Sequence, residues 1–269
     1  MVCKEEIFAN KIFLNSVLPL LKVLAEERGE LKKSFKNKTA VIQISAKDLE
    51  GKVATHFDIK DGVWTVGKGT VENSNLDLEL EFSSIVQLND FFTGKTKKLP
   101  KIKGLRNIGL LAGALKALMA MSKLLGASSP PKKEEEKELL VKMYFYLLSS
   151  GISQLNKAGH PDISNWTKKS PDRVFAWAVT GKPELSAYLR VKAGNSKAGR
   201  GEYKRSKPFF TMRFDTVDSA LGILLQIDDM IDATINERII MEGAPEYGAQ
   251  IGEYMVLVGS YAKGEYKKG

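Results

Sequence analysis

The chain has 269 residues, enough for one or two domains, with the apolar and charged fractions of an ordinary globular protein. One cysteine and two histidines exclude an internal disulfide framework and zinc sites built from several cysteines. The first residues lack the long apolar core of a signal peptide. We therefore expect a cytoplasmic protein that uses no metal and no cofactor.

The first half of the chain predicts one helix followed by a sheet. Residues 4–28 carry apolar side chains at helical spacing. Asp61-Gly62 is the strongest hairpin signal, because a tight turn needs positive φ, which glycine adopts freely. The pattern predicts strands at 41–44, 53–59, 63–66 and 76–82.

The last of these strands leads into two helices. Apolar residues at 76–82 alternate with acidic ones, which predicts one buried face and one solvent-exposed face. Either serine of the pair Ser83-Ser84 can cap the helix that follows. The remaining elements of this half are a helix that ends at Phe92, a short strand at 99–103 and a long apolar helix at 105–125.

A segment with two prolines and small polar residues, 127–133, breaks the pattern and predicts a linker. The predicted domains are therefore 1–126 and 134–269. The second half begins with three glutamates, which favour a helix start, and ends with a helix opened by Pro245. Between these helices we expect strands at 173–179, 185–192, 197–203 and 208–214, a helix at 216–233 and a strand at 235–242.

The two halves repeat one pattern. A shift of 132 residues places Gly62 on Gly194 and Phe82 on Phe214, and Gly67-Lys68-Gly69 falls on Gly199-Arg200-Gly201. A repeat of about 130 residues indicates two copies of one folded unit. Each copy reads as a helix, four antiparallel strands in a meander, a helix, a fifth strand and a helix. The predicted fold is thus α+β, with a five-stranded, mainly antiparallel sheet covered by helices in each domain.

Residues suited to catalysis are few. His56 lies on a strand, and its counterpart in the repeat is Tyr188, so we interpret this position as structural. His160 lies in a loop after a helix, and we expect it to be exposed. Cys3 lies near a terminus and is interpreted as a bystander.

An acidic cluster in the second half is the one candidate for a hard cation. We prefer a solvated helix face, because Ile227, Met230 and Ile231 predict that the other face is buried. The cluster consists of Asp228, Asp229, Asp232 and Glu237.

Apolar helices are the more prominent feature. Residues 107–121 are apolar on nearly all sides, which requires wide burial, a ligand to cover or a membrane surface to touch. Fifteen residues are too few to span a bilayer comfortably. The net charge is +9, and much of it lies in one lysine run that either forms a solvated face or meets anionic headgroups. We expect no nucleic-acid partner, since no matching motif accompanies this charge.

The order of elements and several motifs resemble the sterol carrier protein 2 family, a lipid-binding fold. The motifs are Gly62, Gly67-x-Gly69, the alternating strand Leu76 to Phe82, Thr93-Gly94-Lys95 and Lys101-Ile102-Lys103-Gly104. The resemblance spans about residues 36–126 and 170–263. It implies an apolar tunnel between sheet and helices in each of two tandem domains, without catalytic residues.

Two departures from the family pattern affect the implied tunnels. Only six residues separate Gly94 from Lys101, where the family has a longer segment, and the second copy lacks the Thr-Gly-Lys motif. Either tunnel can therefore be closed in this chain.

The resulting prediction is a non-catalytic protein that binds, and transfers or presents, a lipid or other apolar ligand. The predicted ligand-facing residues are Phe91, Phe92, Leu111, Leu115, Leu118 and Met119 in the first domain and Leu221, Leu224, Leu225, Met230, Tyr254 and Met255 in the second. The predicted contacts to an anionic membrane are Lys95, Lys97, Lys98, Lys101 and Lys103. The alternatives are an accessory scaffold with filled cores that assists a lipid-modifying enzyme, and an enzyme that uses Cys3 or His56.

Overall fold

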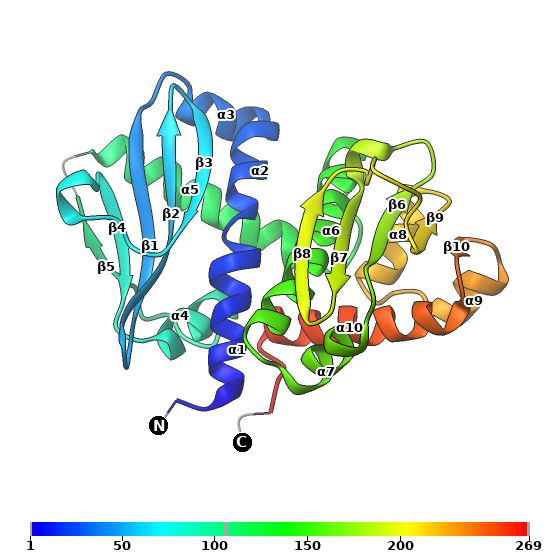
Figure 1. Cartoon of the computed structure of the whole chain (residues 1–269). Coiled ribbons are helices and arrows are strands. Elements are labelled where there is room, and N and C mark those ends of the chain that lie inside the picture. Colours follow the sequence, from blue (N-terminus) through cyan, green and yellow to red (C-terminus); the bar gives the residue numbers. More distant parts are fainter. Residues whose placement is uncertain (1, 105–106, 268–269) are drawn as a thin grey trace. The chain divides into compact units, whose positions relative to one another are not determined.

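The computed structural model describes residues 2–104 and 107–267. The chain divides into two compact units. Unit 1 comprises the residues up to Lys123 together with those from Ser260 onward, and unit 2 is Leu124–Gly259. Figure 1 follows the chain through both units by colour, from the blue N-terminal helix to the red C-terminal one.

Unit 1 places a five-stranded sheet against helices from both ends of its sequence. Its elements are α1 (Lys4–Ile12), the π-helical turn η1 (Phe13–Val17), α2 (Leu20–Glu27), α3 (Gly29–Phe35), β1 (Ala40–Asp48), β2 (Gly51–Lys60), β3 (Val63–Lys68), the 3₁₀ turn η2 (Asn73–Asn75), β4 (Leu78–Phe82), α4 (Ile85–Phe92), β5 (Lys101–Lys103) and α5 (Ile108–Leu125).

Unit 2 follows the same plan, with an unbroken first helix and an added short helix before its last strand. Its elements are α6 (Glu134–Lys157), α7 (Pro161–Lys169), β6 (Arg173–Val179), the 3₁₀ turn η3 (Pro183–Leu185), β7 (Ala187–Lys192), β8 (Asn195–Arg200), β9 (Phe210–Phe214), α8 (Val217–Leu224), α9 (Met230–Ile235), β10 (Ile239–Glu242) and α10 (Pro245–Lys263). The predicted linker lies between α5 and α6.

The α+β class with two five-stranded sheets is confirmed, and the sheets share one topology. The strand order is β3-β2-β1-β4-β5 in unit 1 and β8-β7-β6-β9-β10 in unit 2. The predicted meander is wrong at the centre, because β1 pairs parallel with β4, and β6 with β9. The other pairings are antiparallel. The segment after β3 crosses the sheet from its edge, so β4 adds beside β1 rather than beside β3.

Local turn and cap signals are confirmed. Asp61 and Gly62 have φ of +50° and +79° between β2 and β3. The Ser84 side chain accepts a hydrogen bond from the backbone N–H of Gln87 and so caps α4. Pro245 occupies the start of α10. Each signal depends on residues adjacent in sequence, which explains why the sequence alone is sufficient.

Two predicted helices are interrupted. The helix expected at 4–28 has a π-helical turn, η1, between α1 and α2. The helix expected at 216–233 is wrong as one piece, because α8 ends before Gln226, whose φ is +59°. Asp229 then caps α9 through the N–H groups of Ile231 and Asp232. Of the helix expected at 105–125, residues 105 and 106 lie outside the described residues.

Both histidines are accounted for by packing. His56 lies opposite Gly67 across β2 and β3, as Tyr188 lies opposite Gly199 across β7 and β8. A Cβ on Gly67 would lie 1.9 Å from His56 Nε2, so each ring covers a glycine that has no side chain. His160 is buried, so its predicted exposure is wrong. His160 is the N-cap residue of α7, and its backbone N–H donates to the Leu155 carbonyl at 2.9 Å, which holds the turn against the end of α6.

The C-terminal segment packs within unit 1. The Phe8 and Tyr261 rings meet edge to face at 6.1 Å, and the Tyr266 hydroxyl donates to Glu6 at 3.0 Å. Burial and the nearby Glu6 carboxylate raise the pKa of Tyr266 above its ordinary range. The segment predicted as one domain, 134–269, therefore ends in residues that pack on α1.

Candidate functional site

Helix α5 is the least buried apolar element of unit 1. Among the residues that the structure describes, two stretches have the length and apolarity of a membrane span, Lys4–Glu27 and α5. Most of the first is buried (72% of its most apolar window), whereas only 33% of the α5 window is buried. Soluble core helices pass the same test of length and composition, so the difference in burial is the informative observation. An apolar helix left uncovered needs a further apolar partner.

The contacts of α5 run along α3. A Cβ on Gly113 would lie 3.1 Å from the Phe35 ring, so the glycine lets this ring approach the helix closely. Phe35 in turn packs edge to face on Trp64 of β3, with 4.8 Å between ring centres. Lys116 Nζ lies 3.2 Å from Glu30 of α3. One side of α5 thus packs against α3 and the core, and the opposite side faces solvent.

The predicted ligand-facing residues of unit 1 form a gradient from core to solvent. Leu118 is buried, Leu111 is half-buried, Leu115 is 38% exposed and Met119 is 65% exposed. Phe91 and Phe92 of α4 are half-buried. Their rings contact other core rings, with 5.2 Å from Phe91 to Phe82 and 5.7 Å from Phe92 to Phe13.

The corresponding residues of unit 2 already have protein partners. Leu221, Leu224, Tyr254 and Met255 are buried, and Leu225 and Met230 are half-buried. The Tyr254 ring lies 5.1 Å from Trp166, and Trp177 Nε1 donates to Met255 Sδ at 3.2 Å. Burial raises the pKa of Tyr254 to about 12. Tyr254 and Met255 of α10 therefore pack on aromatic side chains of unit 2.

The five predicted membrane lysines do not share one environment. Lys95 donates to the Gly264 carbonyl and lies 5.5 Å from the centre of the Tyr266 ring. Lys103 pairs with Glu79 and Glu81. Lys97, Lys98 and Lys101 are exposed, as is Leu99 (71%) between them. Three lysines of the run are therefore presented to solvent, and two have partners within unit 1.

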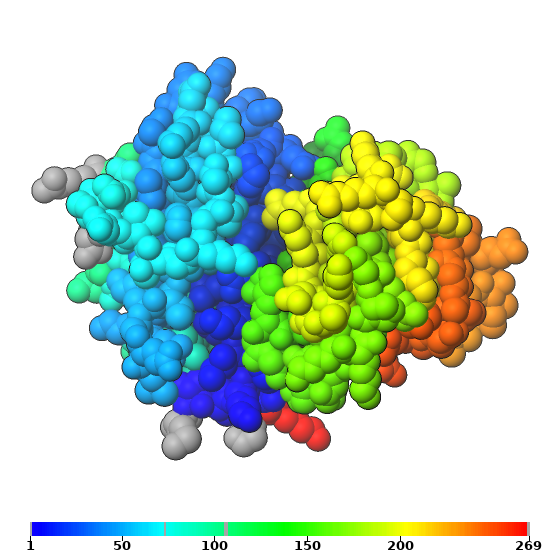
Figure 2. Space-filling view, in the orientation of Figure 1, coloured from blue at the N-terminus to red at the C-terminus, as the bar shows by residue number. Residues whose placement is uncertain are grey.

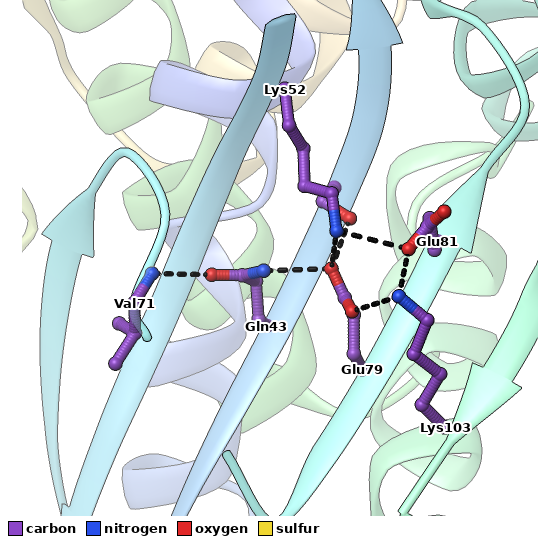
Figure 3. Close-up of polar contacts among 7 residues, drawn as sticks. Gln43, Lys52, Val71, Glu79, Glu81 and Lys103 are labelled. Carbon is purple, nitrogen blue, oxygen red and sulfur yellow. Dashed lines mark hydrogen bonds and ion pairs between the residues drawn. The ribbon is translucent and has the colours of Figure 1, made fainter. Parts of the chain in front are cut away.

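A buried ion cluster on the other sheet face of unit 1 was missed by the sequence analysis. Figure 3 shows the Glu79 carboxylate between two lysines, 2.9 Å from Lys52 Nζ and 2.9 Å from Lys103 Nζ. It also accepts hydrogen bonds from Gln43 Nε2 at 2.7 Å and Ser45 Oγ at 2.6 Å. Glu79 is 1% exposed, so the predicted solvent-exposed face of β4 is wrong at this position. Lysine and glutamine side chains cover it.

The cluster fixes the charge of its members. Burial raises the pKa of Glu79, but hydrogen bonds from Ser45, Lys52, Lys103 and Gln43 outweigh it and lower the pKa to about 2. Hydrogen bonds from Lys103 and Lys52 likewise lower the pKa of Glu81. A general acid or base works best with a pKa near the working pH. These two carboxylates are therefore suited to an ion cluster that stabilises the sheet.

Acid will weaken unit 1 through Glu79. Its folded pKa is below the ordinary 4.5, so its contribution to stability is complete above about 4.5 and is lost as the pH falls toward about 2. We expect the unfolding free energy of Glu79→Gln to fall less steeply over this range, by up to about 1.4 kcal/mol per pH unit. Urea unfolding at a series of pH values measures both slopes, and equal slopes would contradict the assignment.

Unit 2 has a related ion pair with reversed charges. Arg213 Nε donates to Glu242 at 2.7 Å, across β9 and β10. In unit 1 the same diagonal joins Glu81 of β4 to Lys103 of β5. Both residues of the unit 2 pair are about one-third exposed. The sheets thus share the position of this pair but not its burial.

The acidic cluster of unit 2 is a surface feature. Asp228 pairs with Arg238 at 2.6 Å, and Asp229 caps α9. Within the described residues, 2–104 and 107–267, no group of three or more His, Cys, Asp or Glu side chains could hold a metal ion. The prediction that Ile227 and Ile231 are buried is wrong, because they are 53% and 70% exposed. The break before α9 turns their side chains outward.

No known protein-family profile and no curated protein matches the chain. Several solved structures are similar to part of the chain, and three of them represent the range. One is a conserved hypothetical protein from Thermus thermophilus, described as a possible sterol carrier protein (17% identity, 44% of this chain, 84% of that one, TM-score 0.29). The second is a UbiJ-SCP2 ubiquinone synthesis protein (16% identity, 43% of this chain, 96% of that one, TM-score 0.28). The third is the sec-alkylsulfatase Pisa1 from Pseudomonas sp. (9% identity, 82% of this chain, 60% of that one, TM-score 0.28). These values assign the chain to no family.

Proposed function

We propose that the protein is a tandem of two sterol-carrier-like domains and that it binds the hydrocarbon part of a lipid without catalysing a reaction. The sequence motifs resemble those of that family, and the two sheets have one strand order. The observation that carries the proposal is helix α5, which is apolar over eighteen residues and mostly unburied. Covering its side chains with hydrocarbon gains about 0.8 kcal/mol per buried CH₂ group.

Unit 1 is the better candidate for the binding unit. The sheet pairings place Ile42 and Ile44 of β1 where unit 2 has Phe175 and Trp177 of β6. In unit 2 these rings pack against aromatic and methionine side chains, including Tyr247 and Met255 of α10. Because the β1 side chains are smaller, we infer that they cover less of α5 and that a ligand covers the remainder. Leu111 and Leu118 lie on the core side of α5 and are the proposed contacts.

A fluorescent fatty acid tests the proposal on matched variants. Leu111 of α5 and Leu225 after α8 are both half-buried leucines at predicted ligand positions, one in each unit. We expect Leu111→Gln to weaken uptake about tenfold, since a polar amide in an apolar contact costs about 1–2 kcal/mol. Leu225→Gln is the control and should change uptake less than about twofold.

Two results would contradict this assignment. Saturable uptake that responds equally to both variants would remove unit 1 as the binding unit. No uptake by the unmodified protein would instead favour a scaffold with filled cores. The contacts of Phe91 and Phe92 with core rings support that alternative.

A further inference from the structure

Helix α5 presents one continuous apolar side to solvent. Ile108, Leu115 and Met119 are 76%, 38% and 65% exposed, and their spacing places them on one side of the helix. The two charged residues of α5, Lys116 and Lys123, are also exposed, and both are basic. We call Ile108, Leu115, Met119, Lys116 and Lys123 the α5 surface.

A basic border runs beside the α5 surface. Helix α3 contacts α5 through the Lys116–Glu30 ion pair, and Lys38 after α3 donates to the Gly109 carbonyl at 3.2 Å. One acidic residue, Glu30, takes part in these contacts. We call the four lysines of this segment, Lys32, Lys33, Lys36 and Lys38, the α3 border; Lys38 contacts α5, and the other three are exposed.

The charge of the whole unit agrees with this border. Unit 1 holds 23 lysines and arginines against 15 aspartates and glutamates, a net charge of +8. Unit 2 holds 18 against 17, a net charge of +1. Nearly all of the excess positive charge of the chain therefore lies on the unit that carries the α5 surface.

We infer that the α5 surface docks on the surface of a bilayer that contains anionic lipid. Ile108 and Met119 would enter the boundary between headgroups and acyl chains, as the apolar side of an interfacial helix does. Lys116, Lys123 and the α3 border would meet the lipid phosphates. The inference rests on the proposed function, to which it adds the surface from which unit 1 takes its ligand.

A second set of exposed apolar side chains, at α9, has acidic neighbours instead of basic ones. Ile231 and Ile235 of α9 are spaced by four residues and are 70% and 72% exposed, and Ile227 before the helix is 53% exposed. In Figure 2 the orange segment that contains α9 lies at the surface. This stripe is bordered by acidic side chains, among them Asp232 and Glu237, which anionic headgroups repel. Apolar exposure alone does not attract an anionic bilayer, so the α9 stripe serves as the matched control.

Vesicle flotation tests the inference on the full chain. The probes are phosphatidylcholine vesicles with and without phosphatidylserine. We expect binding only to the anionic vesicles, and a loss of about tenfold in the partition coefficient for the double variant Ile108→Glu/Met119→Glu. The control Ile231→Glu/Ile235→Glu changes two equally exposed isoleucines and should bind like the unmodified protein. Circular dichroism verifies that all variants are folded.

Three outcomes, besides the absence of flotation, would overturn the inference. These are equal binding to neutral and anionic vesicles, equal loss in both double variants, and a dimer in solution that only the α5 variant disrupts. The last would identify a second copy of the chain as the partner. Fatty-acid uptake by the same variants is measured in a separate experiment, in solution without vesicles. Uptake without flotation removes the docking inference alone, and flotation without uptake removes the proposed function.

Discussion

Glu79→Ala is expected to destabilise unit 1 by about 3 kcal/mol. The carboxylate is 1% exposed and receives hydrogen bonds from Gln43, Ser45, Lys52 and Lys103. Its removal leaves the buried Gln43 and Ser45 donors without their acceptor, and it leaves two ammonium groups to share Glu81. Hydrogen–deuterium exchange of β4 peptides under increasing urea measures the change in unit 1 alone.

Glu242→Ala in unit 2 is the matched control. Glu242 also lies at a β-strand pairing and has a cationic partner, Arg213, but it is 32% exposed. Ion pairs with this exposure contribute less than about 1 kcal/mol. If the two substitutions destabilise their units equally, burial is not what makes the Glu79 cluster important.

Gly104→Ala is expected to be the other strongly destabilising change, at about 3 kcal/mol. Gly104 follows β5 with φ of +85°, and a Cβ there would lie 2.0 Å from the Asp77 carbonyl oxygen. That oxygen belongs to the backbone next to β4 and cannot move without disturbing the β4–β5 pairing.

Gly69→Ala separates the clash from the backbone conformation. Gly69 has nearly the same φ, +82°, but a Cβ there would have no heavy atom within 4 Å. The strain of positive φ costs about 1 kcal/mol at either position, so the excess at Gly104 reports the clash. Urea unfolding gives both values. A smaller effect at Gly104 than at Gly69 would contradict the position of β5.

The sequence contains enough information for the strands and turns of both units. Alternating apolar residues predict β4, and Asp61-Gly62 predicts the hairpin between β2 and β3, because each depends on neighbours in the chain. Strand neighbours across the sheet are set by the path of the connecting segments. The alternation of apolar and acidic residues in β4 is the same whether β4 pairs with β1 or with β3. It therefore could not predict the parallel pairing with β1.

The surroundings of particular side chains were harder to predict for the same reason. Glu79 alternates with leucines as a solvent-exposed residue does, and its burial depends on Lys52 and Lys103 from two other strands. The sequence does contain a signal for this burial. Once the strand pairing is known, both lysines lie on the same sheet face as the two glutamates of β4. Ile231 and Ile235 follow helical spacing as core residues do, and only the break before α9 exposes them.

Organic extraction of the purified full chain, followed by mass spectrometry, shows whether the protein carries a lipid. Unit 1 is proposed to hold a hydrocarbon chain against the core side of α5. We expect about one lipid per protein in the extract, with that content strongly reduced in Leu111→Gln and retained in Leu225→Gln. Repeated extracts without lipid, from protein that also fails to take up added fatty acid, would contradict it.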